Sequence, residues 1–126
     1  MARRHFLLIA GLMALFFGVT MLAAPDQMLT SMAVDSPGAE RVLQWMSCVL
    51  ISVGLINILS RNDDGSTALR AVMLGNIVLH LLGFGIDVYH HSVGFVQQSG
   101  VIMGGVVHGL LTLGFAYYLS KLPPRR

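Results

Sequence analysis

A row of ionisable and small side chains runs along one otherwise aliphatic segment of the sequence, Leu69–His90. At about 100° per residue around a helix, the row occupies a strip roughly 100° wide. Ionisable groups in such apolar surroundings are costly, face the inside of a helical bundle and are candidates for function. The strip contains Asn76, His80, Gly83, Asp87 and His90, and His91 lies at its edge.

A further histidine, His108, lies in another apolar segment, Gly100–Leu119, where it shares one face with Gly104 and Phe115. At a rise of about 1.5 Å per residue, His80 and His108 each lie about 18 Å from the inner ends of their segments. Antiparallel packing of the two segments therefore places both imidazoles at one depth. We expect the two side chains to approach within about 7 Å.

Two histidines at one depth are open to three interpretations. They can form a neutral hydrogen-bonded pair, or bond separately to carbonyl groups, and so hold helices together. They can belong to a site for an organic ligand such as a quinone, a lipid headgroup or a sterol-like molecule. They can also be the axial ligands of a b-type haem. The candidate ligand-binding residues are Asn76, His80, Gly83, Asp87, His108 and Gln44, and the candidate haem ligands are His80 and His108.

A carboxylate and two imidazoles lie one helical turn apart at the outer end of the strip. Asp87 is followed by His90 and His91 at spacings of three and four, which can chelate a divalent metal ion. The alternative is a hydrated helix end, with the histidines at the level of the lipid headgroups. Any further metal ligand would have to come from Asp26, Asp35 or Glu40.

The elements that position these residues are four apolar segments, each about 20 residues long. Hydrophobic residues make up 55% of the 126-residue chain and charged residues only 11%, whereas ordinary soluble domains have about 25% charged residues. A membrane-spanning helix needs about 20 mostly apolar residues, so we expect an all-α, polytopic membrane protein with one domain, residues 1–126, built as an antiparallel four-helix bundle. The expected helices are His5–Ala24, Glu40–Ser60, Leu69–His90 and Gly100–Leu119, with a short surface helix at 25–33.

The basic residues predict the orientation of this bundle, because Lys and Arg flank the cytoplasmic ends of membrane helices. Seven of the eight Lys and Arg residues lie at the ends that we assign to the cytoplasm, together with both termini. The eighth, Arg41, follows Glu40 and can be neutralised by it. Ser36 can act as the N-cap of the helix expected at Glu40–Ser60. The expected location is the plasma (inner) membrane, crossed several times.

Several classes of protein are excluded by what the sequence lacks. No basic run indicates nucleic-acid binding, and the single Cys48 excludes an intrachain disulfide. No P-loop, dinucleotide-binding turn or nucleophile elbow is present, so we expect no catalytic residues. Glycines at helical spacing permit close helix packing, either within the chain or through a self-association face on Gly100–Leu119 that carries Gly100, Gly104, Gly105 and Gly109.

The layout resembles the small bacterial four-helix membrane proteins grouped as DoxX-like. The features that carry the resemblance are Gly11 and Gly18, the pair Ala24-Pro25, Arg41, Arg70 and the central His80. Some DoxX-like proteins are similar to subunits of quinone-linked oxidoreductases, so the resemblance implies a quinone as a possible ligand of the strip.

Two functions are therefore expected from different classes. The first is a non-catalytic accessory or ligand-binding component of a membrane complex, whose partners are membrane lipid, other membrane subunits or a second copy of the chain. The second is a membrane redox subunit that binds a quinone or a bis-histidine haem b.

Overall fold

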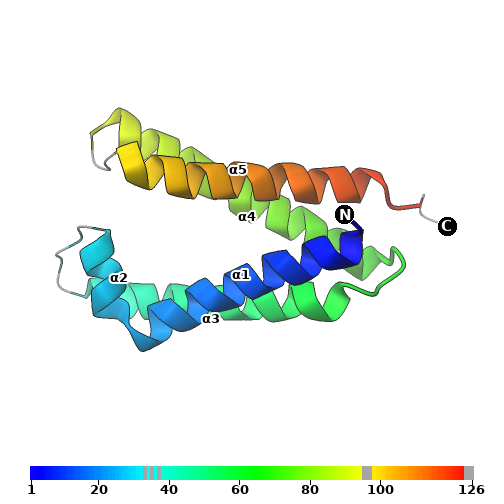
Figure 1. The fold of residues 1–126 in the computed structure, drawn as a ribbon, viewed down its shortest axis with the longest axis horizontal. Helices are drawn as coiled ribbons and strands as arrows, with labels where there is room; N and C mark the ends of the chain where they lie inside the picture. Colours follow the sequence, from blue (N-terminus) through cyan, green and yellow to red (C-terminus); the bar gives the residue numbers. More distant parts are fainter. Residues whose placement is uncertain (33, 35, 37, 95–97, 124–126) are drawn as a thin grey trace. The chain divides into compact units, whose positions relative to one another are not determined.

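The computed structural model describes residues 1–32, 34, 36, 38–94 and 98–123, and these residues form helices joined by short connections. The chain divides into two compact units, Met1–Asn62 and Asp63–Arg126, each built around a pair of antiparallel helices (Figure 1). Each unit is considered by itself below.

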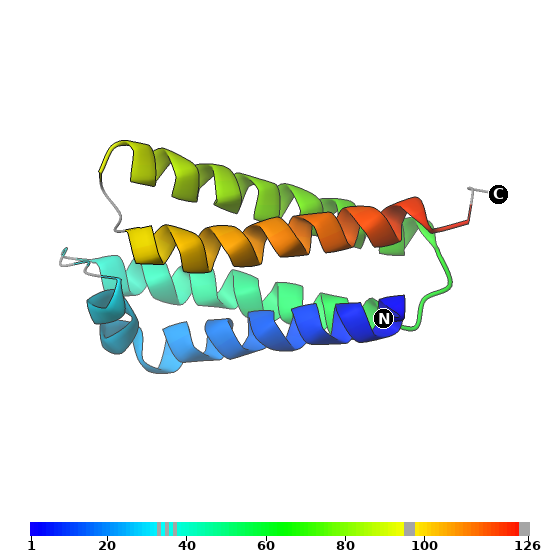
Figure 2. The ribbon, with the colours of Figure 1, turned by 45° about the horizontal axis from the view of Figure 1, so that its top comes forward.

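The first unit consists of α1 (Arg3–Ala23), α2 (Pro25–Ser31) and α3 (Ala39–Ser60). Helices α1 and α3 pack along their length, and the short α2 contacts both of them where the chain turns between them (Figure 2). Pro25 begins α2 at a position where its missing N–H is not needed. A short helix is thus present at Pro25–Ser31, within the expected span 25–33, whose last residue lies outside the described residues; its position on a membrane surface stays a prediction.

Glycines set how closely α1 and α3 approach. A Cβ atom on Gly11 would lie 2.8 Å from the carbonyl oxygen of Gly54, and a Cβ atom on Gly54 would lie 2.8 Å from the carbonyl oxygen of Gly11. A Cβ atom on Gly18 would lie 3.0 Å from the backbone nitrogen of Ile51. The two backbones touch at these points, so Gly11 and Gly18 serve packing within the chain, one of the two roles expected for glycines at such spacing.

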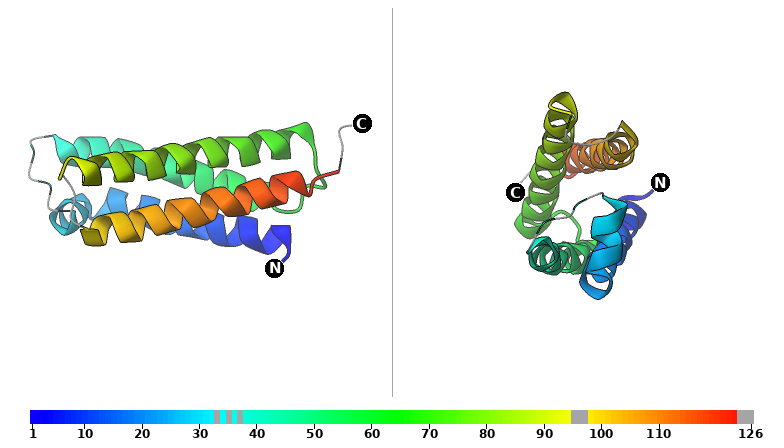
Figure 3. Two further views of the ribbon diagram at one scale, coloured as in Figure 1. Left: turned by 90° about the horizontal axis from the view of Figure 1, so that it is seen from above. Right: turned by 90° about the vertical axis from the view of Figure 1, so that its left-hand side faces the viewer.

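The second unit is the hairpin of α4 (Thr67–Ser92) and α5 (Gln98–Ser120), which run antiparallel (Figure 3). Ser66 caps α4, because its side-chain oxygen accepts a hydrogen bond from the Leu69 N–H at 3.1 Å. Asp63 in turn accepts hydrogen bonds from the backbone N–H groups of Gly65 and Ser66, each at 2.9 Å. These bonds fix the place where α4 begins.

The segment after α5 is attached to the beginning of the same hairpin. The Arg70 guanidinium donates a hydrogen bond to the carbonyl oxygen of Pro123, and the Pro123 ring lies 3.1 Å from where a Cβ atom on Gly65 would be. Leu122 is buried beside them. The end of the described chain therefore holds the beginning of α4 and the end of α5 together, at the end of the hairpin opposite its connecting loop.

The helix bounds agree with the sequence-based expectation to within about two residues, but the expected cap of α3 is wrong. The N-cap residue is Gly38, with a φ of 82° and no side-chain cap hydrogen bond, and Ser36 offers its backbone carbonyl to Ala39 instead. A glycine in the left-handed region turns the chain at this point, so the Ser36 side chain is not aligned with the first free N–H groups of the helix.

Three helices of the described chain, Arg3–Ala23, Ala39–Ser60 and Thr67–Ser92, are long and apolar enough to cross a membrane. Their outer surfaces carry many large apolar side chains in the open; Leu59 is 80% exposed and Phe16 is 65% exposed. Soluble proteins rarely leave so much contiguous apolar surface uncovered, and lipid would cover it at no cost.

Candidate functional site

The two histidines meet inside the α4–α5 hairpin, as predicted from their equal depth. His80 and His108 are joined through their Nδ1 atoms at 3.0 Å, and their ring centroids lie 5.2 Å apart with an angle of 44° between the planes. On its other side the His80 ring stacks on Phe115, at 5.9 Å and 18°. The His80 ring is therefore held between Phe115 and His108.

An Nδ1–Nδ1 hydrogen bond fixes the proton positions of a neutral pair relative to each other. One imidazole must carry its proton on Nδ1 and donate, and the other must leave Nδ1 bare and accept. The donor ring then has a bare Nε2, and the acceptor ring has an Nε2–H. The pair as a whole thus presents one hydrogen-bond acceptor and one donor, and these exchange places only if a second proton also moves from one Nε2 atom to the other when the shared proton moves.

Glycines opposite the polar side chains make this arrangement possible. A Cβ atom on Gly83 of α4 would lie 2.9 Å from the His108 ring, and a Cβ atom on Gly104 of α5 would lie 2.7 Å from Oδ2 of Asp87. Gly83 and Asp87 are four residues apart on α4, and Gly104 and His108 are four residues apart on α5. Each helix therefore contributes one glycine and one polar side chain, and each polar side chain packs against the glycine of the other helix.

Asp87 has a buried oxygen atom that no described group satisfies. Its Oδ2 atom is shielded from solvent and has no hydrogen-bond partner in the described part of the chain. Burying an unsatisfied polar atom costs about 1–3 kcal/mol, so such an atom calls for a ligand, an ion, a water molecule or a proton. With about 1.5 Å of rise per residue, Asp87 lies about 10 Å along α4 from His80, toward the C-terminal end of the helix.

The remaining strip residues have different surroundings. Asn76 is buried, with 5% of its surface exposed, and its side-chain amide donates to the Val72 carbonyl at 2.8 Å. His90 is half-buried, and His91 is exposed. The described residues include no group of three or more His, Cys, Asp or Glu side chains placed to hold a metal ion, so Asp87, His90 and His91 are not gathered as a three-residue site, and the hydrated helix end stays the other interpretation of these residues.

The histidine pair does not fit a haem. Two axial imidazoles need about 4 Å between their iron-binding nitrogens, which separates the ring centroids by about 6 Å with the porphyrin between them. Here the ring centroids are 5.2 Å apart, and the two rings are hydrogen-bonded directly to each other. The close fit of His108 on Gly83 leaves no slot between the helices at this level.

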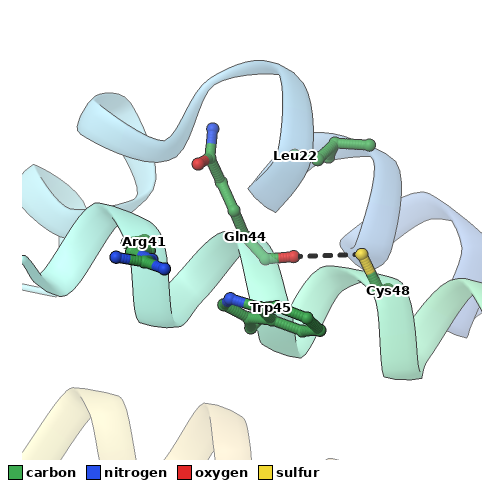
Figure 4. A pocket seen from close by; sticks show the side chains of 5 residues that line it. All are labelled: Leu22, Arg41, Gln44, Trp45 and Cys48. Atoms are coloured by element: carbon green, nitrogen blue, oxygen red, sulfur yellow. Dashed lines mark hydrogen bonds between the residues drawn. The ribbon is translucent and has the colours of Figure 1, made fainter.

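Gln44, which the sequence suggested as a further ligand-binding residue, lies in the first unit and is exposed. It lines an open groove of about 380 Å³, and its other lining residues were not among the binding residues expected from the sequence (Figure 4). The spacing of three and four residues on α3 was the available signal. The lining residues are Leu22, Arg41, Gln44, Trp45 and Cys48.

Comparisons of the chain with protein-family models, with curated proteins and with solved structures find no match. The assignment of function therefore depends on the geometry of the chain itself.

Proposed function

We propose that the chain is a multi-pass protein of the plasma (inner) membrane, in which α1, α3, α4 and α5 cross the bilayer as a four-helix bundle with both termini in the cytoplasm. The support is the apolar length of the helices and the distribution of Lys and Arg, which lie almost entirely at one set of helix ends. The α2 helix and the connection after α4 then face the outside.

Cysteine labelling tests this orientation. In a Cys48→Ser background, Gln27→Cys in α2 should react with a membrane-impermeant maleimide added to intact cells, because α2 faces outward. Asp64→Cys, before α4, should react only after the cells are opened. Both positions are exposed in the structure, so a difference in reaction measures sidedness and not burial. If Asp64→Cys is labelled in intact cells and Gln27→Cys is not, the protein has the opposite orientation in the membrane.

We further propose that the strip on α4 binds the polar head of a small, mostly apolar membrane molecule, and that the protein acts as a ligand-binding component and not as a catalyst. The observation that carries this proposal is the buried Oδ2 atom of Asp87, which has no hydrogen-bond partner among the described residues. A ligand hydroxyl would supply the missing donor. A quinol has such a hydroxyl on an apolar ring, and it is the ligand class that we favour.

The surroundings of Asp87 suit a ligand of this type. Beside the strip α4 carries aliphatic side chains, and Ile86, the residue before Asp87, is 56% exposed and leaves apolar surface at the edge of the strip. Mostly apolar pockets with a few convergent polar groups are typical of small-molecule sites. Farther along the strip, the histidine pair adds two more polar side chains between α4 and α5.

Replacing Asp87 by leucine separates ligand binding from packing. The Asp87→Leu variant should bind decylubiquinol at least ten times more weakly than the wild type, because the acceptor of the quinol hydroxyl is gone. Its resistance to thermal unfolding should be unchanged or higher, since an unsatisfied buried oxygen is removed. Calorimetric titration and thermal unfolding of the detergent-solubilised protein measure the two effects.

Asp64→Leu is the matched control, because Asp64 is exposed in the loop before α4, and this variant should bind as the wild type does. If Asp87→Leu keeps full affinity for decylubiquinol and unfolds at a lower temperature, Asp87 is a packing residue and the ligand proposal is wrong.

A further inference from the structure

The first unit contains a basic side chain, Arg41, that has no ion-pair partner among the residues described for that unit. Arg41 is exposed near the beginning of α3, and its guanidinium has no ion pair or hydrogen bond to any described residue. The neighbour expected to neutralise it, Glu40, lies close to Asp26 of α2 instead. Consecutive residues on a helix point about 100° apart, which explains why Glu40 does not turn back to Arg41.

The position of Arg41 is unusual for this chain. The other seven Lys and Arg residues flank the opposite helix ends, and the connections 25–38 and 93–97 contain no Lys or Arg. An arginine on the outer side of a membrane protein runs against the general distribution of basic residues. A specific anionic partner at that side would account for its presence.

The groove beside Arg41 has the size and the composition of a binding site. Its volume of about 380 Å³ falls within the range of about 300–1,000 Å³ found for small-molecule sites. Arg41, Gln44, Trp45 and Cys48 follow each other at helical spacing along one face of α3, and Leu22 of α1 forms part of the facing wall (Figure 4). Polar and basic groups are thus combined with an apolar wall.

Along α3, the lining residues follow the same order as the phosphate, the glycerol region and the acyl chains of a phospholipid. Arg41 is the third residue of α3, at the level of the phosphate groups if α3 crosses the membrane. Trp45 lies about 6 Å deeper, where tryptophan is enriched at membrane interfaces, and its side chain is 68% exposed. Cys48 lies about one turn deeper still, at the level of the acyl chains.

We propose that this groove binds an anionic phospholipid from the outer leaflet. Arg41 holds the phosphodiester through its two parallel N–H groups, the Gln44 amide bonds the headgroup, and Trp45 and Leu22 contact the glycerol and upper acyl region. Arginine suits this role because its planar fork matches the geometry of a phosphate group. The proposal uses the membrane orientation proposed above, but none of the residues of the α4 strip.

Trp45 is the only tryptophan of the chain and therefore reports directly on this groove. In dodecylmaltoside micelles, palmitoyl-oleoyl-phosphatidylglycerol should change the Trp45 emission in a saturable way. The corresponding phosphatidylcholine should act at least five times more weakly, because its choline compensates the phosphate charge. Glycerol phosphate without acyl chains should leave the emission unchanged at millimolar concentration.

Three variants of the full chain separate the guanidinium from general charge. Arg41→Gln should weaken phosphatidylglycerol binding at least tenfold, and Arg41→Lys should give an intermediate affinity, because it keeps the charge and loses the fork. Arg4→Gln removes the same charge from an exposed position at the beginning of α1 and should bind as the wild type does.

Several results would overturn the proposal: no saturable change in the wild type, equal affinity of Arg41→Gln and Arg4→Gln, or an equal response to free glycerol phosphate. Failure of this test leaves decylubiquinol binding at Asp87 unaffected, because the two sites share no residue.

Discussion

The Gly54→Leu variant should lose about 3 kcal/mol of stability or more, because the leucine side chain has no space between α1 and α3. A Cβ atom at this position would already lie 2.8 Å from the Gly11 carbonyl oxygen and 3.0 Å from the Leu15 backbone nitrogen. Both contacts are to backbone atoms, so the two helices must separate along their length. Overpacking of this kind costs about 1–3 kcal/mol, and more where backbone must move. Titration with sodium dodecyl sulfate, followed by the emission of Trp45 on α3, measures the loss.

A glycine in open space provides the control. Gly75 of α4 has no atom within 4 Å of where its Cβ would lie, and leucine is a better helix former than glycine by up to about 1 kcal/mol. Gly75→Leu should therefore be neutral or slightly stabilising. Equal losses from both substitutions would show that glycine itself, and not the contact between Gly11 and Gly54, is what the helices require.

The second large effect concerns the histidine pair. His80→Leu and His108→Leu should each cost about 1–3 kcal/mol, because either one leaves a lone imidazole in a dry interior. The double variant should cost no more than either single one, since the two residues act as a unit joined at 3.0 Å. Attachment of bulky labels to the two ends of the hairpin, trapping its open state, measures all three free energies.

The exposed His91 supplies the control for this cycle, because His91→Leu removes an imidazole that is exposed and should change the stability little. Imidazole ¹⁵N spectra provide an independent check, and should show one ring protonated on Nδ1 and the other on Nε2. Additive losses in the double variant, or two rings with the same tautomer, would contradict a hydrogen-bonded pair.

The meeting of His80 and His108 could be predicted because a short connection fixes the register of an antiparallel hairpin. Depth along each helix then follows from the constant rise per residue, and both histidines lie equally far from their inner helix ends. The facing of Asp87 and Gly83 toward α5 followed in the same way from helical periodicity. These predictions depend only on backbone regularity, which the chain keeps throughout α4 and α5.

The features of the site that could not be predicted depend on side-chain torsion angles, which helical periodicity does not specify. The predicted approach of the two imidazoles was compatible with a hydrogen-bonded pair, an organic-ligand site or a haem site. Only the direct Nδ1–Nδ1 contact distinguishes the hydrogen-bonded pair from the haem site. Likewise, adjacency in sequence suggested that Glu40 would neutralise Arg41, but the two side chains point in different directions. The cap at Gly38 depended on a left-handed backbone conformation that the neighbouring Ser36 gave no reason to expect.

The exchange of glycines and polar side chains between α4 and α5 constrains how this hairpin can change during evolution. Because His108 lies on Gly83 and Asp87 lies on Gly104, a larger residue at either glycine position is tolerated only after the facing polar side chain has become smaller. Neutral drift at these four positions must therefore proceed in pairs. Descendants of this chain would carry that history as covariation between positions 83 and 108 and between positions 87 and 104, a pattern by which distant relatives can be recognised when overall identity has been lost.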